Sequence, residues 1–201
     1  MNSRLGSAIA TAPASTNAAV NVFITSNLAH PGRAPGGWFS LHSKAGMNSA
    51  RRVVVLVGLP GSGKSSYVER LGVTPLSSDH LRLLLADDAG DQSIHREVFA
   101  TLRYLVRRRL ALGRAVTWVD ATNLTPGERR PYIKLAGLYG CVAEAVFFDV
   151  PLEVCMERNR RRERVVPEEA MRKLAARLVP PSLEEGFAKI TVINAGSGEL
   201  R

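Results

Sequence analysis

The sequence has few cysteines and no long apolar segment, and each shortage excludes a class of protein. Its two cysteines, Cys141 and Cys155, have neither a CxxC nor a metal-like spacing, which excludes a secreted disulfide scaffold and favours a reducing compartment. The longest apolar run, residues 53–57, is far shorter than the roughly 20 residues that a membrane-spanning helix needs. We therefore expect a soluble, cytoplasmic protein without a membrane partner.

Acidic residues are also scarce, and they are absent from the first 46 positions. The chain of 201 residues has 18 acidic and 27 basic side chains, a net charge of +9, which favours a polyanionic partner such as nucleic acid or nucleotide over mere solubility. Small and polar residues dominate 1–46, so we expect a disordered N-terminal extension there, with Met47 as an alternative start. Residues 47–201 then have the usual size of one domain.

Short apolar runs alternate with longer helical stretches from Arg52 onward, a pattern typical of an α/β fold around a parallel sheet. The pattern predicts strands at Val53–Val57, Val73–Leu76, Ala115–Val119, Val142–Phe148 and Ile190–Ile193. It predicts helices at Lys64–Leu71, Asp79–Ala86, Ile94–Leu112, Pro126–Tyr139, Pro151–Arg162 and Pro167–Leu178.

A phosphate-binding motif follows the first predicted strand. The run GLPGSGKS fits the pattern G-x-x-x-x-G-K-[ST] between a buried strand and a helix, the setting in which this motif cradles the phosphates of ATP. We expect Lys64 to reach the β and γ phosphates and the Ser65 hydroxyl to bind Mg²⁺. The predicted nucleotide-binding residues are Gly58, Gly61, Ser62, Gly63, Lys64, Ser65 and Ser66.

A carboxylate and a guanidinium follow the second predicted strand. Asp79 and Arg82 are three positions apart, so a helix beginning at Asp79 places both on one face. Asp79 is suited to accept the proton of an attacking hydroxyl, and Arg82 to hold a phosphate of the acceptor. The alternative is structural, since Asp is a favoured helix cap and such a pair is a common surface ion pair.

Two further polar clusters belong to the candidate site. Asp120 and Asn123, after the third predicted strand, are candidates for acceptor binding, and Asp120 also for orienting a magnesium-bound water or fixing Arg82. Five arginines lie within residues 158–164, where a lid would neutralise charge on the transferred phosphoryl group. Arg158 and Arg162 are its candidate catalytic residues, because a spacing of four places them on one helical face.

Taken in order, the segments GLPGSGKSS, SSDHLR, DATNLTPGERR and VPLEVCMERNRRRERVVPEE resemble the 5′-hydroxyl polynucleotide kinase family of phage and bacterial end-healing enzymes. The resemblance implies an adenylate-kinase-like, three-layer P-loop fold with five parallel strands in the order 2-3-1-4-5. It also implies Asp79 as general base, Arg82 as the ligand of an acceptor phosphate, and Arg158 and Arg162 as lid residues.

These observations predict a kinase that uses ATP and Mg²⁺ to phosphorylate a 5′-OH end of DNA or RNA. Two alternatives stay open at this point. One is a P-loop kinase of a small hydroxyl metabolite or sugar nucleotide, since such enzymes share the phosphate loop and the arginine lid. The other is an ATP-binding module without catalytic activity.

Overall fold

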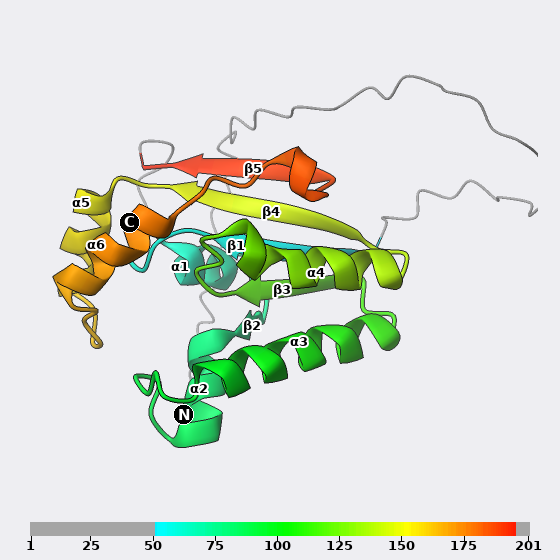
Figure 1. Cartoon of the computed structure of the whole chain (residues 1–201), viewed down its shortest axis with the longest axis horizontal. Helices are drawn as coiled ribbons and strands as arrows, with labels where there is room; N and C mark the ends of the chain where they lie inside the picture. Colours follow the sequence, from blue (N-terminus) through cyan, green and yellow to red (C-terminus); the bar gives the residue numbers. More distant parts are fainter. Residues whose placement is uncertain (1–50, 196–201) are drawn as a thin grey trace, which may run out of the picture.

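The structure, a computed structural model, describes residues 51–195 (Figure 1). The expected disordered extension, residues 1–46, lies outside the described residues. In chain order the elements are β1 (Arg52–Val57), α1 (Lys64–Arg70), β2 (Leu76–Ser77), α2 (Ser78–Ala86), α3 (His95–Ala111), β3 (Val116–Asp120), α4 (Pro126–Leu138), β4 (Val142–Asp149), α5 (Leu152–Arg160), α6 (Glu168–Arg177), the 3₁₀ helix η1 (Leu183–Glu185) and β5 (Lys189–Asn194).

The five strands form one parallel sheet in the order β2-β3-β1-β4-β5, which confirms the predicted fold and strand order. Strand β1 lies at the centre, paired with β3 on one side and β4 on the other. Five of its six residues are buried, because helices cover both faces of a parallel sheet and leave no face for polar side chains. The carboxyl ends of the strands point toward the end of the molecule where α5 and α6 lie (Figure 1).

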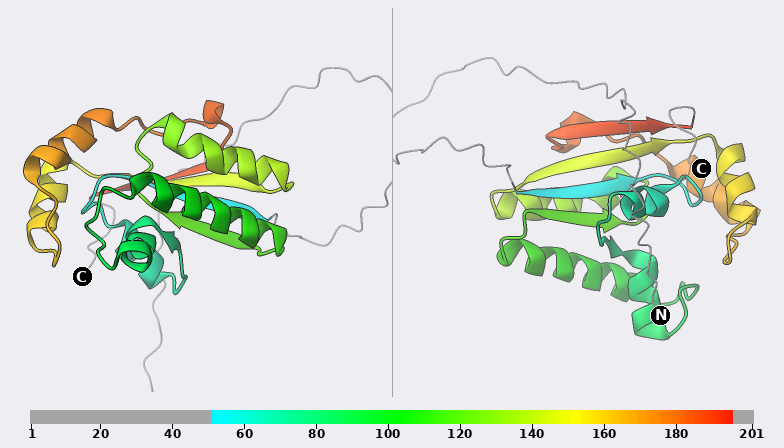
Figure 2. Two further views of the ribbon diagram at one scale, coloured as in Figure 1. Left: turned by 60° about the horizontal axis from the view of Figure 1, so that its bottom comes forward. Right: turned by 180° about the vertical axis from the view of Figure 1, so that it is seen from behind.

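Successive residues of β1 enter two separate cores, as the alternation of side chains in a strand requires. Val53, Val55 and Val57 pack with α3 and α4 on one face of the sheet. Val54 and Leu56 pack with α1, α5 and α6 on the other. Figure 2 shows these two layers of helices from opposite sides of the sheet.

The prediction that the second strand begins at Val73 was wrong. Residues 73–75 are not part of β2, which begins at Leu76. The backbone N–H of Val73 instead closes the end of α1 by donating to the carbonyl of Val68, 3.2 Å away. Pro75 has no N–H to contribute to a ladder, so regular pairing begins after it.

Helix α5 is shorter than predicted, which changes the description of the arginine segment. It ends at Arg160, with Arg161 as its C-cap. Arg162 therefore lies in the loop between α5 and α6, and the prediction that it shares a helical face with Arg158 was wrong. No helix in residues 51–195 is both long enough and apolar enough to cross a membrane.

Candidate active site

The phosphate loop leaves the carboxyl end of β1 through glycines that adopt backbone angles unfavourable for other residues. Gly61 and Gly63 have φ values of 79° and 99°. A Cβ atom on Gly61 would also collide with the carbonyl oxygen of Cys155 in α5. Gly63 is the N-cap of α1 and has no side chain to cap it, so no side chain satisfies the first N–H groups of the helix. The loop needs glycine for both conformation and space.

Lys64 is buried under this loop and held by it. Its Nζ donates to the carbonyls of Gly58 and Leu59 at 2.8 and 2.7 Å, and to the Ser62 hydroxyl at 3.4 Å. Burial lowers the pKa of Lys64 from 10.5 to about 8, and the negative charge of Asp120 only partly opposes this effect. The ammonium therefore lies in a site that disfavours its charge until an anion is present.

Ser65 and Asp120 bring two hard oxygen ligands together at the sheet edge. The Ser65 hydroxyl donates to Oδ2 of Asp120 over 3.2 Å, linking α1 to the end of β3. Burial raises the pKa of Asp120, while the positive charge of Lys64 and the hydrogen bond from Ser65 lower it. A hydroxyl and a carboxylate are ligands that Mg²⁺ prefers, with water and phosphate oxygens completing its shell, so this pair fits the predicted cofactor.

Asp79 and Arg82 occupy one face of α2, as their spacing predicts. Their ion pair measures 2.9 Å between Arg82 Nη1 and Asp79 Oδ1. The side chain of Asp79 is 56% exposed, whereas that of Arg82 is only 5% exposed. Asp79 is not the helix cap, because Ser77 has that position and accepts from the N–H of His80.

The two oxygens of the Asp79 carboxylate have different surroundings. Both nearby guanidinium groups contact Oδ1, that of Arg82 at 2.9 Å and that of Arg164 at 3.9 Å. Within residues 51–195, Oδ2 accepts no hydrogen bond. Arg82 thus orients the carboxylate and leaves one exposed oxygen able to accept a hydrogen bond.

The loop between α5 and α6 carries the arginines of the predicted lid. Asn159 closes its base, since its Nδ2 donates to the carbonyl of Val166 at 2.7 Å and its Oδ1 accepts from the N–H of Val166 at 3.1 Å. Within the described chain, neither Arg158 nor Arg162 forms an ion pair, and both line the cleft described next. Arg164 instead reaches across the cleft and donates to the carbonyl of Ala89.

One cleft of about 1550 Å³ joins these elements. It brings together most of the predicted site residues, namely Gly61, Gly63, Lys64, Ser65, Ser66, Asp79, Arg82, Asp120, Arg158 and Arg162. Gly58 and Ser62 are buried beneath it. Ten lysine and arginine residues line the cleft against three acidic ones. This excess of positive charge favours highly anionic ligands.

Asn123 is the predicted site residue that the structure keeps away from the cleft. Its side chain is 1% exposed, and its Nδ2 donates to the carbonyls of Leu56 and Ala121 at 2.7 and 3.3 Å. Asn123 thus fastens the turn after β3 to β1 and has no free donor for an acceptor. Asp120 likewise pairs with Ser65, whereas the ion-pair partner of Arg82 is Asp79.

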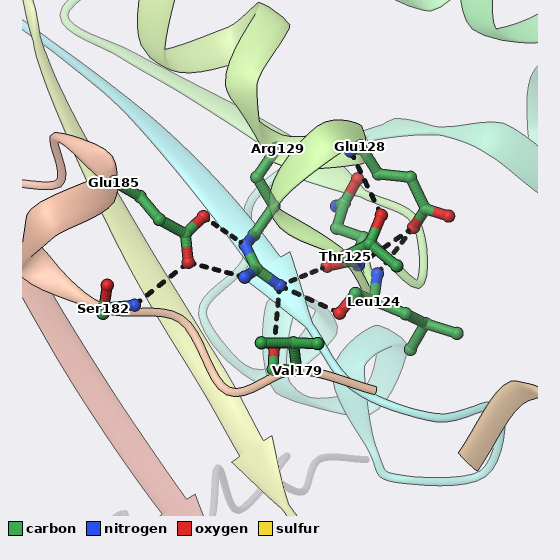
Figure 3. Close-up of polar contacts among 8 residues, drawn as sticks. Leu124, Thr125, Glu128, Arg129, Val179, Ser182 and Glu185 are labelled. Carbon is green, nitrogen blue, oxygen red and sulfur yellow. Dashed lines mark hydrogen bonds and ion pairs between the residues drawn. The ribbon is translucent and has the colours of Figure 1, made fainter. Parts of the chain in front are cut away.

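A buried arginine clamp behind the cleft was missed by sequence reasoning. Arg129 in α4 is fully buried and pairs with both carboxylate oxygens of Glu185, at 2.8 and 2.6 Å (Figure 3). It also donates to three backbone carbonyls, including that of Val179 at 3.0 Å. The clamp ties the segment after α6 to the start of α4. The only available signals were two capping patterns, T-x-x-E at Thr125 and S-x-x-E at Ser182.

Residues 53–181, more than half of the chain, match the family described as an AAA domain. The chain belongs to this family. Together with the sheet order and the phosphate loop, the match makes it a P-loop domain of the kinase type.

Solved structures with a similar fold include a chain of an RNA repair complex and a gluconokinase. One, from the Pnkp1/Rnl/Hen1 RNA repair complex, is 22% identical with a TM-score of 0.56, over 68% of this chain and 47% of that one. A Sinorhizobium meliloti gluconokinase is 19% identical with a TM-score of 0.51, over 73% of this chain and 83% of the gluconokinase. Chaetomium thermophilum Kti12 in complex with ADP-AlF3 is 19% identical with a TM-score of 0.56, over 73% of this chain and 91% of Kti12. At such identities these similarities establish the fold alone.

Proposed function

We propose that this protein transfers the γ-phosphoryl group of ATP to the 5′-hydroxyl end of a polynucleotide. One observation carries the proposal: the Asp79–Arg82 pair opens on the same cleft as Lys64 and Ser65. An acceptor in that cleft meets a carboxylate oxygen that accepts no hydrogen bond from the described residues, and the same cleft is lined by the phosphate loop. The resemblance to the 5′-hydroxyl polynucleotide kinases points to the same acceptor.

The step is an in-line displacement without a covalent enzyme intermediate. The 5′ oxygen forms a bond to the γ-phosphorus as the bond from that phosphorus to the β–γ bridging oxygen breaks, and ADP leaves. The hydroxyl proton passes to Oδ2 of Asp79, acting as general base. Lys64, Arg158 and Arg162 stabilise the charge that spreads over the transferred phosphoryl oxygens. Mg²⁺ held by Ser65 and Asp120 would add further neutralisation of the β and γ phosphates.

The charge of the cleft favours a polynucleotide over a small neutral alcohol. Five of its ten basic side chains are ion-paired with carboxylates, namely Arg82, Arg161, Arg164, Lys173 and Arg177. Of the other five, Lys64, Arg158 and Arg162 are assigned to the triphosphate, which leaves Arg96 and Arg103 as a surplus. A neutral sugar would leave this surplus unused, whereas a strand with several phosphates would use it. Arg82, beside Asp79, is our candidate for the first phosphate of the acceptor strand.

The decisive experiment incubates the full chain with labelled ATP, Mg²⁺ and a panel of acceptors. The panel contains 5′-OH DNA and RNA oligomers, nucleosides, 3′-phosphorylated nucleosides and sugars. We expect transfer to the oligomers, with a rate that falls steeply as salt increases. Transfer to sugars alone, or only at a rate indifferent to salt, would assign a small-molecule kinase. Nucleotide binding with no transfer to any acceptor would leave a binding module.

Asp79→Asn tests the base directly. It should lower turnover roughly 10² to 10⁴ fold while ATP still binds, because only proton acceptance is lost. Asp87→Asn is the matched control: Asp87 is the exposed C-cap of the same helix, lies outside the cleft, and has a φ of 56° that Asn tolerates well. Equal activity of the two variants would remove Asp79 from the mechanism.

A further inference from the structure

A second groove continues from the cleft along the surface between α3 and α4. It has a volume of about 430 Å³ and is lined by Arg103, Tyr104 and Arg107 from α3 and by Pro131, Lys134 and Leu138 from α4. We call it the α3–α4 groove. Neither the phosphate loop nor the Asp79–Arg82 pair belongs to it, so phosphoryl transfer as described above leaves its residues without a role.

Cleft and groove are continuous, because Arg103 and Pro131 line both. Arg96, Phe99, Arg103 and Arg107 follow one another on α3 at spacings of three and four, which places them along one face of the helix. From the first to the last of these residues the helix rises about 16 Å. A ligand that leaves the cleft past Arg96 therefore meets Arg103, which lines both cavities, and then Arg107 in the groove.

The chemistry of the groove is that of a surface for single-stranded nucleic acid. Three of its residues are basic, and no acidic side chain lines it. Tyr104 is 58% exposed and stands between two of these cations in the sequence, and Leu138 beside it in the groove is 75% exposed. Cations that follow a phosphate backbone, alternating with an exposed ring on which a base stacks, are the recurring pattern of proteins that bind single strands.

The floor of the groove is rigid. Val106 of α3 and Tyr132 and Ala136 of α4 are buried in one core under it. Arg107 is braced by its Nε, which donates to the hydroxyl of Tyr139 over 3.2 Å. The two helices that shape the groove are therefore fixed by their shared core before a strand binds.

We propose that the α3–α4 groove binds the nucleotides that follow the 5′ end of the acceptor strand. Arg103 and Lys134 contact their phosphates, and Tyr104 stacks on a base. The proposal rests on the proposed function, which it extends from the reacting end to the rest of the strand. It makes the enzyme selective for acceptors long enough to extend from the cleft into the groove.

The test compares the double variant Tyr104→Ala/Lys134→Ala with Arg108→Ala. Arg108 is an exposed arginine of the same helix that lines neither the cleft nor the groove, so it serves as the matched control. Each protein phosphorylates a 5′-OH dinucleotide and a 5′-OH octamer, in DNA and RNA forms. For the double variant we expect kcat/KM on the octamer to fall about tenfold or more and that on the dinucleotide to stay unchanged. The slope of log KM against log salt should shrink by about 0.7 for the lost phosphate contact.

If the double variant loses kcat/KM equally on the dinucleotide and the octamer, or on neither, the proposal is overturned. The same loss of kcat/KM in Arg108→Ala would also overturn it. DNA and RNA arms that differ would show which sugar the groove prefers. Thermal unfolding of each variant checks that all are folded to the same extent.

Binding without catalysis separates this proposal from the function on which it rests. Fluorescence anisotropy of a labelled 5′-phosphorylated octamer should show weaker binding by the double variant whether or not transfer occurs. If no acceptor is phosphorylated but this difference persists, the proposed function fails and the groove assignment stands. If polyglutamate competes as well as an unlabelled octamer, the groove belongs to an acidic protein partner and our assignment is overturned.

Discussion

Nucleotide binding should draw a proton onto Lys64 when the pH is raised above neutrality. Burial depresses the pKa of this residue from 10.5 to about 8, a shift that corresponds to about 3 kcal/mol of unfavourable free energy for the charged ammonium in the empty site. The phosphates of a nucleotide favour the charged form, so binding raises the pKa again. The free protein has lost part of its Lys64 protons above pH 7, and the complex regains them.

The size of the effect follows from the pKa alone. About 0.1 proton should be taken up per nucleotide bound at pH 7, about 0.5 at pH 8 and about 0.9 at pH 9. Beyond pH 8 the nucleotide affinity should decrease with each pH unit by a factor that approaches about ten. The same shift has a consequence for stability. Between pH 8 and 10.5 the unfolded chain keeps a proton that the folded chain has lost, so this group makes the folded state more stable as pH rises.

Isothermal titration of ADP into the full chain measures the uptake. Titrations in buffers with different ionisation enthalpies, at pH 8 and 9, give the number of protons directly, because the phosphates of ADP are already ionised there. Lys64→Arg is the control, since a guanidinium stays charged throughout and should take up no proton. An uptake that does not increase from pH 8 to pH 9, or that persists in the arginine variant, would refute the role assigned to Lys64.

Three further changes test the scaffold of the site. Gly61→Ala should lower the free energy of unfolding by at least about 1 kcal/mol and weaken nucleotide binding in a titration. The reason is that the φ of 79° is unfavourable for alanine and the added methyl meets the carbonyl of Cys155. Wild-type affinity would show that the loop adapts. Asn159→Ala removes both hydrogen bonds to Val166 and should cost about 2 kcal/mol in urea unfolding, and a loss below 0.5 kcal/mol would mean that the lid base is held otherwise. Glu185→Ala leaves the buried Arg129 guanidinium without its carboxylate and should lower the free energy of unfolding by about 3 to 5 kcal/mol. The control Glu184→Ala, which changes the exposed neighbour, should have almost no effect. Similar melting temperatures for the two variants would contradict this.

The sheet and the phosphate loop could be predicted because their signals are local. Five consecutive apolar residues followed by GLPGSGKS specify a buried strand, a turn and a helix without reference to the rest of the chain. The spacing of Asp79 and Arg82 also predicted that they share one face of a helix, since three positions along a helix fix which side chains are neighbours.

The contacts of Arg129 and Asn123 could not be predicted, because their partners lie far away in the sequence. Arg129 and Glu185 are separated by 56 positions, and no local pattern indicates that this arginine, among so many, is the buried one. Asn123 was a candidate for the acceptor because it follows a strand at the polar sheet edge, yet its amide is used by the backbone of a strand 67 positions earlier. Composition cannot reveal which polar side chains the fold itself needs.

The clamp around Arg129 fixes a reference point against which any movement of the proposed lid, the loop between α5 and α6, can be measured. Arg177, the last residue of α6, is itself bound to Glu128 of α4 at 2.6 Å, so the end of that helix and the start of α4 form one body. Spectroscopic probes placed on Arg161 and on α4 would therefore report the position of the lid as a change in distance. A probe placed at Val179 would give a constant signal, and this makes it the internal standard for such a measurement.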